Sequence, residues 1–205
     1  LEDHFDYLFI DVGPSLGPLN RSALLNSDYF FTPMASDIFS LLGVKNISNW
    51  IKSWAREYYA AICQTFPQTP FYTPDFYEKN LINCSETQLV KFAGYSIQQY
   101  SGRKFKDGIR PTKSYEKVVK EVPGEVIKYL REFANKNISD EDLMLGDIPY
   151  SYSVIPLSQI NNMPIFDLTY ESGVRGGQTA SVESYKEYLE VIATNFLRNV
   201  GDTNE

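Results

Sequence analysis

The chain has 205 residues, of which 43% are hydrophobic and 22% are charged. This composition is typical of a soluble globular protein that can bury a core, and it excludes an intrinsically disordered chain. The formal net charge of -7 argues against a surface broadly suited to nucleic-acid phosphates. No run of about 18 apolar residues predicts a membrane span.

The cysteines and the histidine favour a reduced, cytoplasmic protein without a zinc site. Cys63 and Cys84 make neither a disulfide framework nor a metal-ligand pair. The single histidine, His4, lies among acidic residues and is interpreted as a surface side chain. The sequence opens at Leu1 without a signal-peptide pattern, and an apolar run follows almost at once. We therefore expect a chain whose N-terminal part is missing.

Two strands and two helices are predicted in the first third of the chain. The nearly unbroken apolar run at 7–12 predicts a strand buried on both faces of a parallel sheet. Residues 18–26 predict a helix, with proline in its first turn. Residues 29–32 predict a second strand, ended by the proline that follows. Asp37 predicts the start of a long helix, because apolar residues recur at helical spacing after it.

The middle of the chain is predicted to hold one strand between two loops. Residues 64–75 contain three prolines and predict a loop, and residues 90–100 predict the third strand. Residues 102–111 predict a polar, basic loop. Basic residues gather in and after this loop: Arg103, Lys104, Lys106, Arg110, Lys113 and Lys117. We interpret them as a solvated loop and helix start, although a local basic patch stays an alternative.

The last part of the chain is predicted to hold two helices around a fourth strand. Residues 115–135 predict a helix that Pro123 and Gly124 kink or split. Residues 152–155 predict a short strand ended by Pro156, and residues 182–200 predict an amphipathic helix. Strands that alternate with helices indicate crossover units and a parallel sheet. Ligands of such sheets bind beyond the carboxyl ends of the strands.

Polar residues and prolines follow each predicted strand, and these positions are the candidate site. They are Asp11 with Gly13, Pro14 and Ser15; Pro33 to Asp37; Gln98 and Gln99; and Pro156, Leu157 and Ser158. An apolar strand that ends in aspartate is how nucleoside triphosphatases place a carboxylate near Mg²⁺, while the phosphates supply other ligands. Strands also end in aspartate because it forms turns. Asp11 alone therefore leaves both interpretations open.

A longer string around Asp11 resembles a known family. Residues 5–17, FDYLFIDVGPSLG, resemble the second nucleotide motif of the ParA family: an Asp-Tyr start, an apolar strand, Asp, and then Pro-Ser-Leu-Gly. The similarity continues through 22–29 and 33–44, and it returns at 153–156 and in the helix at 185–189. The chain thus resembles the C-terminal part of a ParA/MinD-type (Soj-like) P-loop partition ATPase, with an insertion-like region at about 55–145.

The resemblance implies a fold and an activity. The fold would be α/β, a Rossmann-like P-loop NTPase fold with a mostly parallel sheet flanked by helices, incomplete at its N-terminus. Residues 1–205 would form a single, partial ATPase domain. The intact protein would be a cytoplasmic homodimer that binds ATP and Mg²⁺. It would act in plasmid or chromosome partitioning by ATP-dependent dimerisation, with a partition protein or non-specific DNA as further partners.

The resemblance also implies roles for individual residues. Asp11 would be the Mg²⁺-side acid, acting through water, and Gly13 and Pro14 would lie near the γ-phosphate and the dimer face. Gln98 or Gln99 would meet the adenine edge through the side-chain amide, although strand-end hydrogen bonding is an equal alternative for both. Pro156 and Leu157 would flank the base.

The sequence departs from the family pattern in ways that limit the activity of this chain. It contains no Gly-Lys-Ser or Gly-Lys-Thr, and its nearest string, residues 175–179, lacks lysine and predicts a flexible loop. Without the phosphate-binding loop, the chain alone is expected to be inactive and to bind ATP poorly. The family's arginine after the last strand is missing as well, which weakens the expectation of DNA binding.

Two other functions stay open. One is a non-catalytic interaction or scaffold domain that keeps the fold without its phosphate-binding loop. The other is a MinD-like positioning ATPase on a membrane, which we rank lower because residues 182–200 carry glutamates and few basic groups. The missing strands would also leave a sheet edge and apolar faces uncovered, so we expect either pairing with another copy or an N-terminal segment that covers them.

Overall fold

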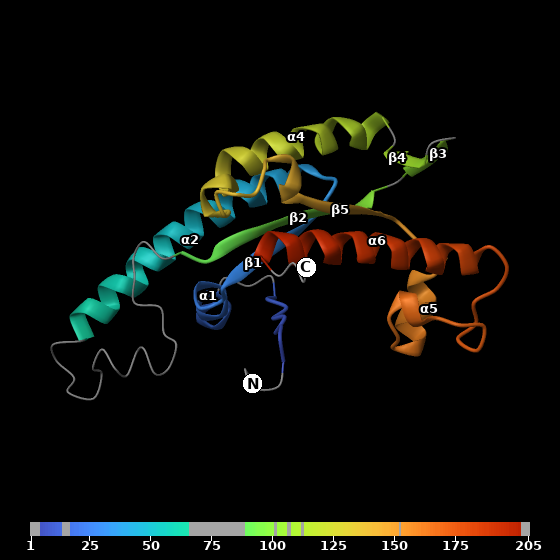
Figure 1. Cartoon of the computed structure of the whole chain (residues 1–205), viewed down its shortest axis with the longest axis horizontal. Helices are drawn as coiled ribbons and strands as arrows, with labels where there is room; N and C mark the ends of the chain where they lie inside the picture. The colour runs from blue at the N-terminus through green and yellow to red at the C-terminus, as the bar shows by residue number, and fades with distance from the viewer. Residues whose placement is uncertain are drawn as a thin grey trace. The chain divides into compact units, whose positions relative to one another are not determined.

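The structure is a computed structural model, which describes residues 5–13, 17–65, 89–100, 102–105, 108–111, 113–151 and 153–201 (Figure 1). Contacts between Cα atoms divide the chain into two compact units. Unit 1 consists of residues 1–30 and 47–91, and unit 2 of residues 31–46 and 92–205. The assignment of the chain to a single partial domain stays a prediction.

Unit 1 contains the first predicted helix, and the prediction is confirmed. Helix α1 spans Pro18–Leu25, with proline in its first turn as predicted. At its end, the Nδ2 atom of Asn26 donates to the carbonyl oxygen of Ser22 over 2.9 Å. The backbone amide of Asn26 donates to the same carbonyl over 3.1 Å, so one residue closes the last turn of α1 through two donors.

A small aromatic core holds α1 against the second half of α2 in unit 1. Leu25, Trp54 and Ala55 are buried together. The rings of Trp50 and Trp54 stack with centroids 5.9 Å apart, and the guanidinium of Arg21 lies 5.0 Å from the centroid of Trp54. Trp54 is buried and Trp50 is half-buried, and such large rings bury much apolar surface in a small cluster.

The strand predicted at 7–12 is wrong. Residues 5–13 have no regular secondary structure, and they belong to neither sheet of the part of the chain that the structure describes. Leu8 and Phe9 are each 66% exposed and Ile10 is 54% exposed, so the run is not buried on either face. An apolar run forms a buried strand only where a neighbouring strand pairs with its backbone, and neither sheet formed by the described residues includes this run.

Strand β1, Tyr29–Ala35, does not end before Pro33 as predicted but continues through it. The three-stranded sheet has the order β1-β2-β5, so β1 is an edge strand. Proline has no N–H to donate, and an edge strand tolerates it where that side faces away from the neighbouring strand. The start of β1 lies beside the start of β2, because the Lys91 amide donates to the Asp28 carbonyl over 3.0 Å.

Helix α2, Ile38–Thr65, confirms the long helix predicted after Asp37. The Oδ1 atom of Asp37 accepts a hydrogen bond from the Ser40 amide over 2.8 Å, which caps the first turn. The helix extends through Thr65, past the start of the loop predicted at 64–75. The rest of that loop lies outside the described residues.

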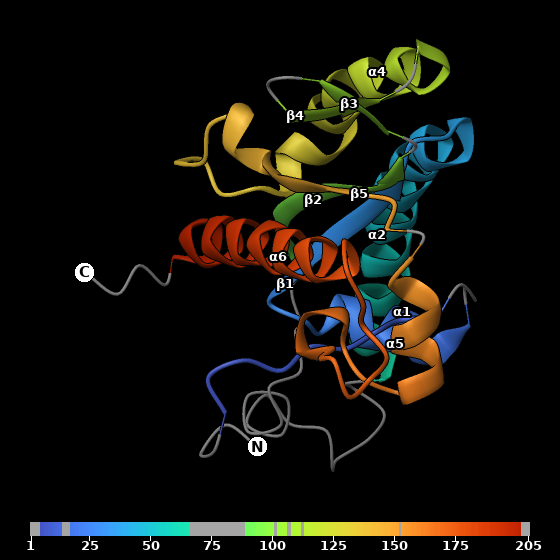
Figure 2. The same cartoon turned by 90° about the vertical axis from the view of Figure 1, so that its right-hand side faces the viewer.

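Strands β2, Lys91–Tyr100, and β5, Met144–Pro149, pair in parallel in unit 2. Residues 92–97 of β2 are all buried, as expected for a central strand covered on both faces. Helices α4 and α6 lie on opposite faces of these two strands (Figure 2). The predicted strand at 90–100 and the predicted α/β class, with a parallel sheet flanked by helices, are confirmed.

The fourth strand predicted at 152–155 is wrong. The strand that follows β2 in the sheet order β1-β2-β5 is β5, which ends at Pro149. Residues 153–154 form a turn, and helix α5 spans Ile155–Asn161 with Pro156 in its first turn. Proline suits a first helical turn because the N–H that it lacks would have no partner there.

Two further elements of unit 2 differ from prediction. The basic loop predicted at 102–111 contains an antiparallel hairpin of β3, Gly102–Phe105, and β4, Gly108–Pro111. Of the predicted kink or split at Pro123, the split is wrong, because helix α4, Lys113–Leu130, continues through the proline. Val122, Val126 and Leu130 are fully buried at a spacing of four residues, and this apolar stripe stabilises the helix across the proline.

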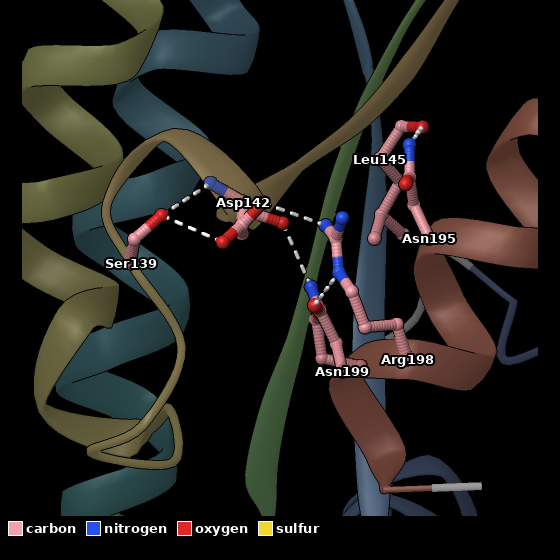
Figure 3. Close-up of polar contacts among 7 residues, drawn as sticks. Ser139, Asp142, Leu145, Asn195, Arg198 and Asn199 are labelled. Atoms are coloured by element: carbon pink, nitrogen blue, oxygen red, sulfur yellow. Dashed lines mark hydrogen bonds and ion pairs between the residues drawn. The ribbon is translucent and has the colours of Figure 1, made fainter. Parts of the chain in front are cut away.

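Helix α6, Gln178–Val200, confirms the predicted C-terminal helix and packs on β5. Polar side chains in its last two turns donate hydrogen bonds to backbone carbonyls of neighbouring elements in unit 2 (Figure 3). Asn195 donates to the Leu145 carbonyl over 2.8 Å, and Asn199 donates to the Asp142 and Ala93 carbonyls, each over 2.8 Å. Short 3₁₀ turns at Arg131–Phe133, Glu141–Leu143 and Ile165–Asp167 complete the described elements.

Candidate nucleotide-binding residues

Asp11 lies in the exposed, extended segment of unit 1. Its side chain is exposed, and the apolar residues that precede it are exposed as well. A carboxylate in this setting keeps its water shell, so it can accept hydrogen bonds from the water of a hydrated cation. The predicted place of Asp11 at the end of a strand is wrong, because residues 5–13 form no strand.

Gly13 is linked to helix α1. The Nδ2 atom of Asn20, in the first turns of α1, donates to the Gly13 carbonyl oxygen over 2.9 Å. This hydrogen bond connects the backbone at Gly13, two residues after Asp11, to helix α1. Helix α1 in turn packs against Trp54 through Leu25 and Arg21. Pro14, the other residue expected near the γ-phosphate, lies outside the described residues.

The donor set around Asp11 fits one part of a magnesium site. Mg²⁺ keeps several waters and takes one or two carboxylates together with substrate phosphates, so a single exposed aspartate suffices for the protein's share. Among the described residues, no group of three or more histidine, cysteine, aspartate or glutamate side chains could hold a metal by itself. A Mg²⁺ ion at Asp11 would therefore need further ligands such as water and phosphate oxygens.

Gln98 lies near the carboxyl end of β2 in unit 2, as predicted. It is half-buried, pairs in register with Ile148 of β5, and donates from Nε2 to the Ser96 Oγ atom over 3.3 Å. This contact is the strand-end hydrogen bonding that was the alternative to adenine recognition. Gln99 follows in the same strand, and its side chain lies outside what the structure describes.

Pro156 and Leu157 lie in α5 and not after a strand. Pro156 is exposed, whereas Leu157 packs against the buried cluster of Val154, Ile165, Leu168, Val174 and Val182. The packing gives Leu157 a structural role that needs no ligand. Because the strand ends earlier in the chain, the position predicted for residues that flank the base is occupied by Pro149, Tyr150 and Ser151.

The sequence offered a signal for this missed strand end. In MLGDIP, at 144–149, the apolar residues Met144, Leu145 and Ile148 are interrupted by a glycine and an aspartate, and the proline ends the strand. Gly146 has a φ of 157°, and a Cβ there would lie 2.8 Å from the Ile192 side chain of α6. The glycine that weakens the strand pattern is thus the residue that lets α6 approach the sheet.

Residues 175–177 of the string at 175–179 form a loop, whereas Gln178 and Thr179 are the first residues of α6, so the predicted loop is confirmed only up to Gly177. The Arg175 amide donates to the Gln178 Oε1 atom over 2.9 Å, and the Arg175 guanidinium lies 3.5 Å from the centroid of the Tyr170 ring. Gln178 also donates to the Ser153 carbonyl over 3.0 Å. All of these contacts lie within unit 2. The Arg175 guanidinium already interacts with the Tyr170 ring.

The predicted site residues are divided between the two units. Asp11 and Gly13 belong to unit 1, whereas Gln98, Gln99, Pro156 and Leu157 belong to unit 2. Within unit 2, the sheet register brings Gln98 beside the end of β5. The nucleotide roles of these residues stay predictions.

Comparisons with known proteins relate the chain to an ATPase type. Residues 1–62 match the model of a family described as AAA domain. The structure is similar to the crystal structure of protein DIP2308 from Corynebacterium diphtheriae, with a TM-score of 0.59 and 22% sequence identity. The likeness covers 98% of this chain and 51% of that chain, so this chain spans about half the length of the solved protein.

At this identity the structural likeness shows the fold alone, and a comparison with curated proteins gives no match. The match over residues 1–62 supports a domain of the P-loop ATPase type without singling out the partition ATPases.

Proposed function

We propose that this chain is the C-terminal portion of a ParA-type ATPase that acts in plasmid or chromosome partitioning by ATP-dependent dimerisation. The observation that carries the proposal is the string from Asp6 to Gly17, which lies within the region that matches the AAA domain family. The parallel strand pair β2–β5 between α4 and α6 supports it, because this layered arrangement is the one that such ATPases use.

Asp11 is the residue to which the proposal assigns the chemistry of the cation. Its exposed carboxylate would orient water on Mg²⁺, and the Asn20–Gly13 hydrogen bond would hold the following backbone in place. Bound Mg²⁺ would neutralise charge on the nucleotide phosphates. The phosphate-binding loop itself has no counterpart in these 205 residues, so the proposed activity belongs to the intact protein.

The partners are part of the same proposal. The intact protein would form a homodimer in the cytoplasm, and the dimer would bind a partition protein or non-specific DNA. Within the described residues, no helix is both long and apolar enough to cross a bilayer. A MinD-like role at a membrane surface is the less favoured variant, because the exposed face of α6 carries Glu183, Glu187 and Glu190.

One observation favours a non-catalytic interaction domain instead. The chain contains no Gly-Lys-Ser or Gly-Lys-Thr, and it exposes a continuous apolar segment around Phe9. Segments of this kind mark protein contacts. The two functions predict different results for a substitution of Asp11. Only an ATPase would lose Mg²⁺-dependent ATP turnover when this carboxylate is removed.

The test uses the full-length protein with Asp11→Asn, which keeps the size of the side chain and removes its charge. The matched control is Asp6→Asn, five residues earlier in the same exposed segment. We expect Asp11→Asn to lower Mg²⁺-dependent ATP turnover by about 100-fold or more, as for loss of an electrostatic contact to a reacting phosphate, and Asp6→Asn to leave it within about twofold. Equal turnover in the two variants would remove Asp11 from the site, and an absence of ATP binding in the unaltered protein would favour the interaction domain.

A further inference from the structure

Asn20 joins helix α1 to the backbone that follows Asp11. It is the third residue of α1, its side chain is half-buried, and its Nδ2 atom donates to the Gly13 carbonyl oxygen over 2.9 Å. The two residues are seven apart in sequence, whereas hydrogen bonds within a helix join residues four apart. The Asn20 side chain therefore serves the segment before the helix.

Asn26, at the other end of α1, uses the same donor differently. Its Nδ2 atom donates to the Ser22 carbonyl over 2.9 Å, four residues earlier in the same helix. The two asparagines thus make side-chain hydrogen bonds of equal length. The bond of Asn26 closes the helix, and the bond of Asn20 reaches the backbone beside the candidate cation site.

Helix α1 also contacts the aromatic core of unit 1 through the residues that follow Asn20. The guanidinium of Arg21 lies 5.0 Å from the centroid of the Trp54 ring, and Leu25 is buried in the same cluster as Trp54. Trp54 in turn stacks on Trp50 with centroids 5.9 Å apart. Since α1 has eight residues and is about 12 Å long, a displacement of its first turn moves the side chains that contact Trp54.

We propose that Asn20 is a positioning residue that couples the backbone at Gly13 to Trp54. A Mg²⁺–nucleoside triphosphate at Asp11 would set the position of Gly13, and the Asn20 hydrogen bond would transmit that position through α1 to the aromatic core. All of these residues belong to unit 1, and contiguous contacts of this kind carry coupling between separated groups. The inference rests on the proposed function for its ligand. It adds a route by which the nucleotide state reaches the second half of α2.

Isosteric variants separate this role from a contribution to helix stability. Asn20→Asp keeps the shape of the side chain and replaces the Nδ2 donor with an oxygen, which repels the Gly13 carbonyl. A carboxylate in the first turn is favoured by the helix dipole, so α1 itself would be equally or more stable. Asn26→Asp is the matched control, because it removes the same donor and its charge opposes the dipole at the end of the helix.

The first experiment uses the 205-residue chain without nucleotide. Chymotrypsin cleaves after aromatic residues, and Tyr7 and Phe9 lie in the exposed segment before Gly13. We expect Asn20→Asp to speed cleavage there by about threefold to tenfold, as for loss of one hydrogen bond, while the Tm of unit 1, followed by tryptophan fluorescence, stays equal or rises. Asn26→Asp should lower this Tm and leave cleavage within about twofold. Equal cleavage of the two variants would overturn the inference.

The second experiment uses the full-length protein with Mg²⁺ and adenylyl imidodiphosphate, an ATP analogue that is not hydrolysed. The change in tryptophan emission on binding is assigned to the aromatic core by its loss in Trp54→Phe. At saturating analogue, which the anisotropy of a fluorescent ATP derivative verifies, we expect Asn20→Ala to reduce this change by about threefold or more. Asn26→Ala should retain it. Alanine is used here because it removes the donor without adding charge near the phosphates.

The outcomes distinguish this inference from the proposed function. An emission change of equal size in Asn20→Ala and Asn26→Ala would overturn the inference, and so would no change in an unaltered protein that binds the analogue. Both results leave ATP binding, and with it the proposed function, intact. If the unaltered full-length protein binds no nucleotide, the proposed function fails. Proteolysis of the 205-residue chain then decides by itself whether Asn20 couples Gly13 to α1.

Discussion

Asn199 tests whether side-chain hydrogen bonds from α6 stabilise the strands of unit 2. Its side chain is 2% exposed, and its Nδ2 atom donates to the carbonyls of Ala93 in β2 and Asp142 before β5, each over 2.8 Å. Asn199→Ala would leave both carbonyls without this donor at a buried position. An unsatisfied buried polar group costs about 1–3 kcal/mol, so we expect a loss of about 2–4 kcal/mol in the free energy of unfolding.

A graded series gives the expected order of effects. Asn195→Ala removes one half-buried hydrogen bond, to the Leu145 carbonyl, and should cost about 1 kcal/mol. Thr194→Ala removes an exposed hydroxyl that bonds only within α6, to the Glu190 carbonyl, and should change stability by less than about 0.5 kcal/mol. The ranking Asn199, Asn195, Thr194 follows from the number and burial of the hydrogen bonds lost.

The assay must report on unit 2 by itself. Both tryptophans, Trp50 and Trp54, lie in unit 1, so tryptophan fluorescence follows that unit. Hydrogen exchange at the amides of α6 follows unit 2 instead. We expect Asn199→Ala to speed exchange there by about 30-fold or more, since 1.4 kcal/mol corresponds to a factor of 10. A change no larger than that of Thr194→Ala would refute the assigned role of these hydrogen bonds.

Three further predictions concern backbone, cap and pH. Gly94 has a φ of 141°, and a Cβ there would lie 2.6 Å from the Leu143 carbonyl oxygen, so Gly94→Ala should cost about 2 kcal/mol or more in denaturant unfolding. Gly43→Ala, in α2 with nothing within 4 Å, should instead stabilise by about 0.5–1 kcal/mol. Asp37→Ala removes the cap of α2 and should cost about 1 kcal/mol, which urea denaturation would show as a lower midpoint. Burial raises the pKa of the Tyr95 hydroxyl to about 12. The folded chain therefore favours the neutral form, and this contribution to stability is intact below pH 10 and is lost as the pH rises toward 12. Tyr95→Phe should weaken the fall in stability over that window.

Local signals in the sequence predicted the elements whose formation depends on their own residues. Helix α1 follows from proline in its first turn, α2 from the Asp37 cap and apolar spacing, and α6 from its amphipathic stripe. β2 was predicted because apolar and polar residues alternate through 90–100. Each of these patterns is complete within the segment, and the structure confirms them.

The errors concern features that depend on a neighbour in space. Pro33 was expected to end β1, and it is tolerated because β1 lies at the sheet edge. The strand β5 was missed because Gly146, at the contact with α6, interrupts its apolar pattern. Pro123 does not split α4, since the buried stripe on both sides of it holds the helix together. None of these neighbours can be read from local spacing.

The site shows the same division between local and spatial signals. The sequence around Asp11 predicts that its carboxylate is a site residue. The apolar run before it predicts a strand that would position this carboxylate. Residues 5–13 instead remain extended and exposed, outside both sheets of the described structure. In this chain, the backbone after Asp11 is therefore held by the hydrogen bond from Asn20 to Gly13.

The hydrogen bond from Asn20 to the Gly13 carbonyl constrains the Asp11 carboxylate less than pairing within a central strand would. Catalytic groups need their geometry fixed in advance, because misplacement by about 1 Å costs on the order of 100-fold in rate. The exposed side chains of Leu8, Phe9 and Ile10 would supply that rigidity only when another strand pairs with their segment and buries them. Under the proposed function, strand pairing at residues 7–12 would bury the apolar run and position Asp11 in the same step.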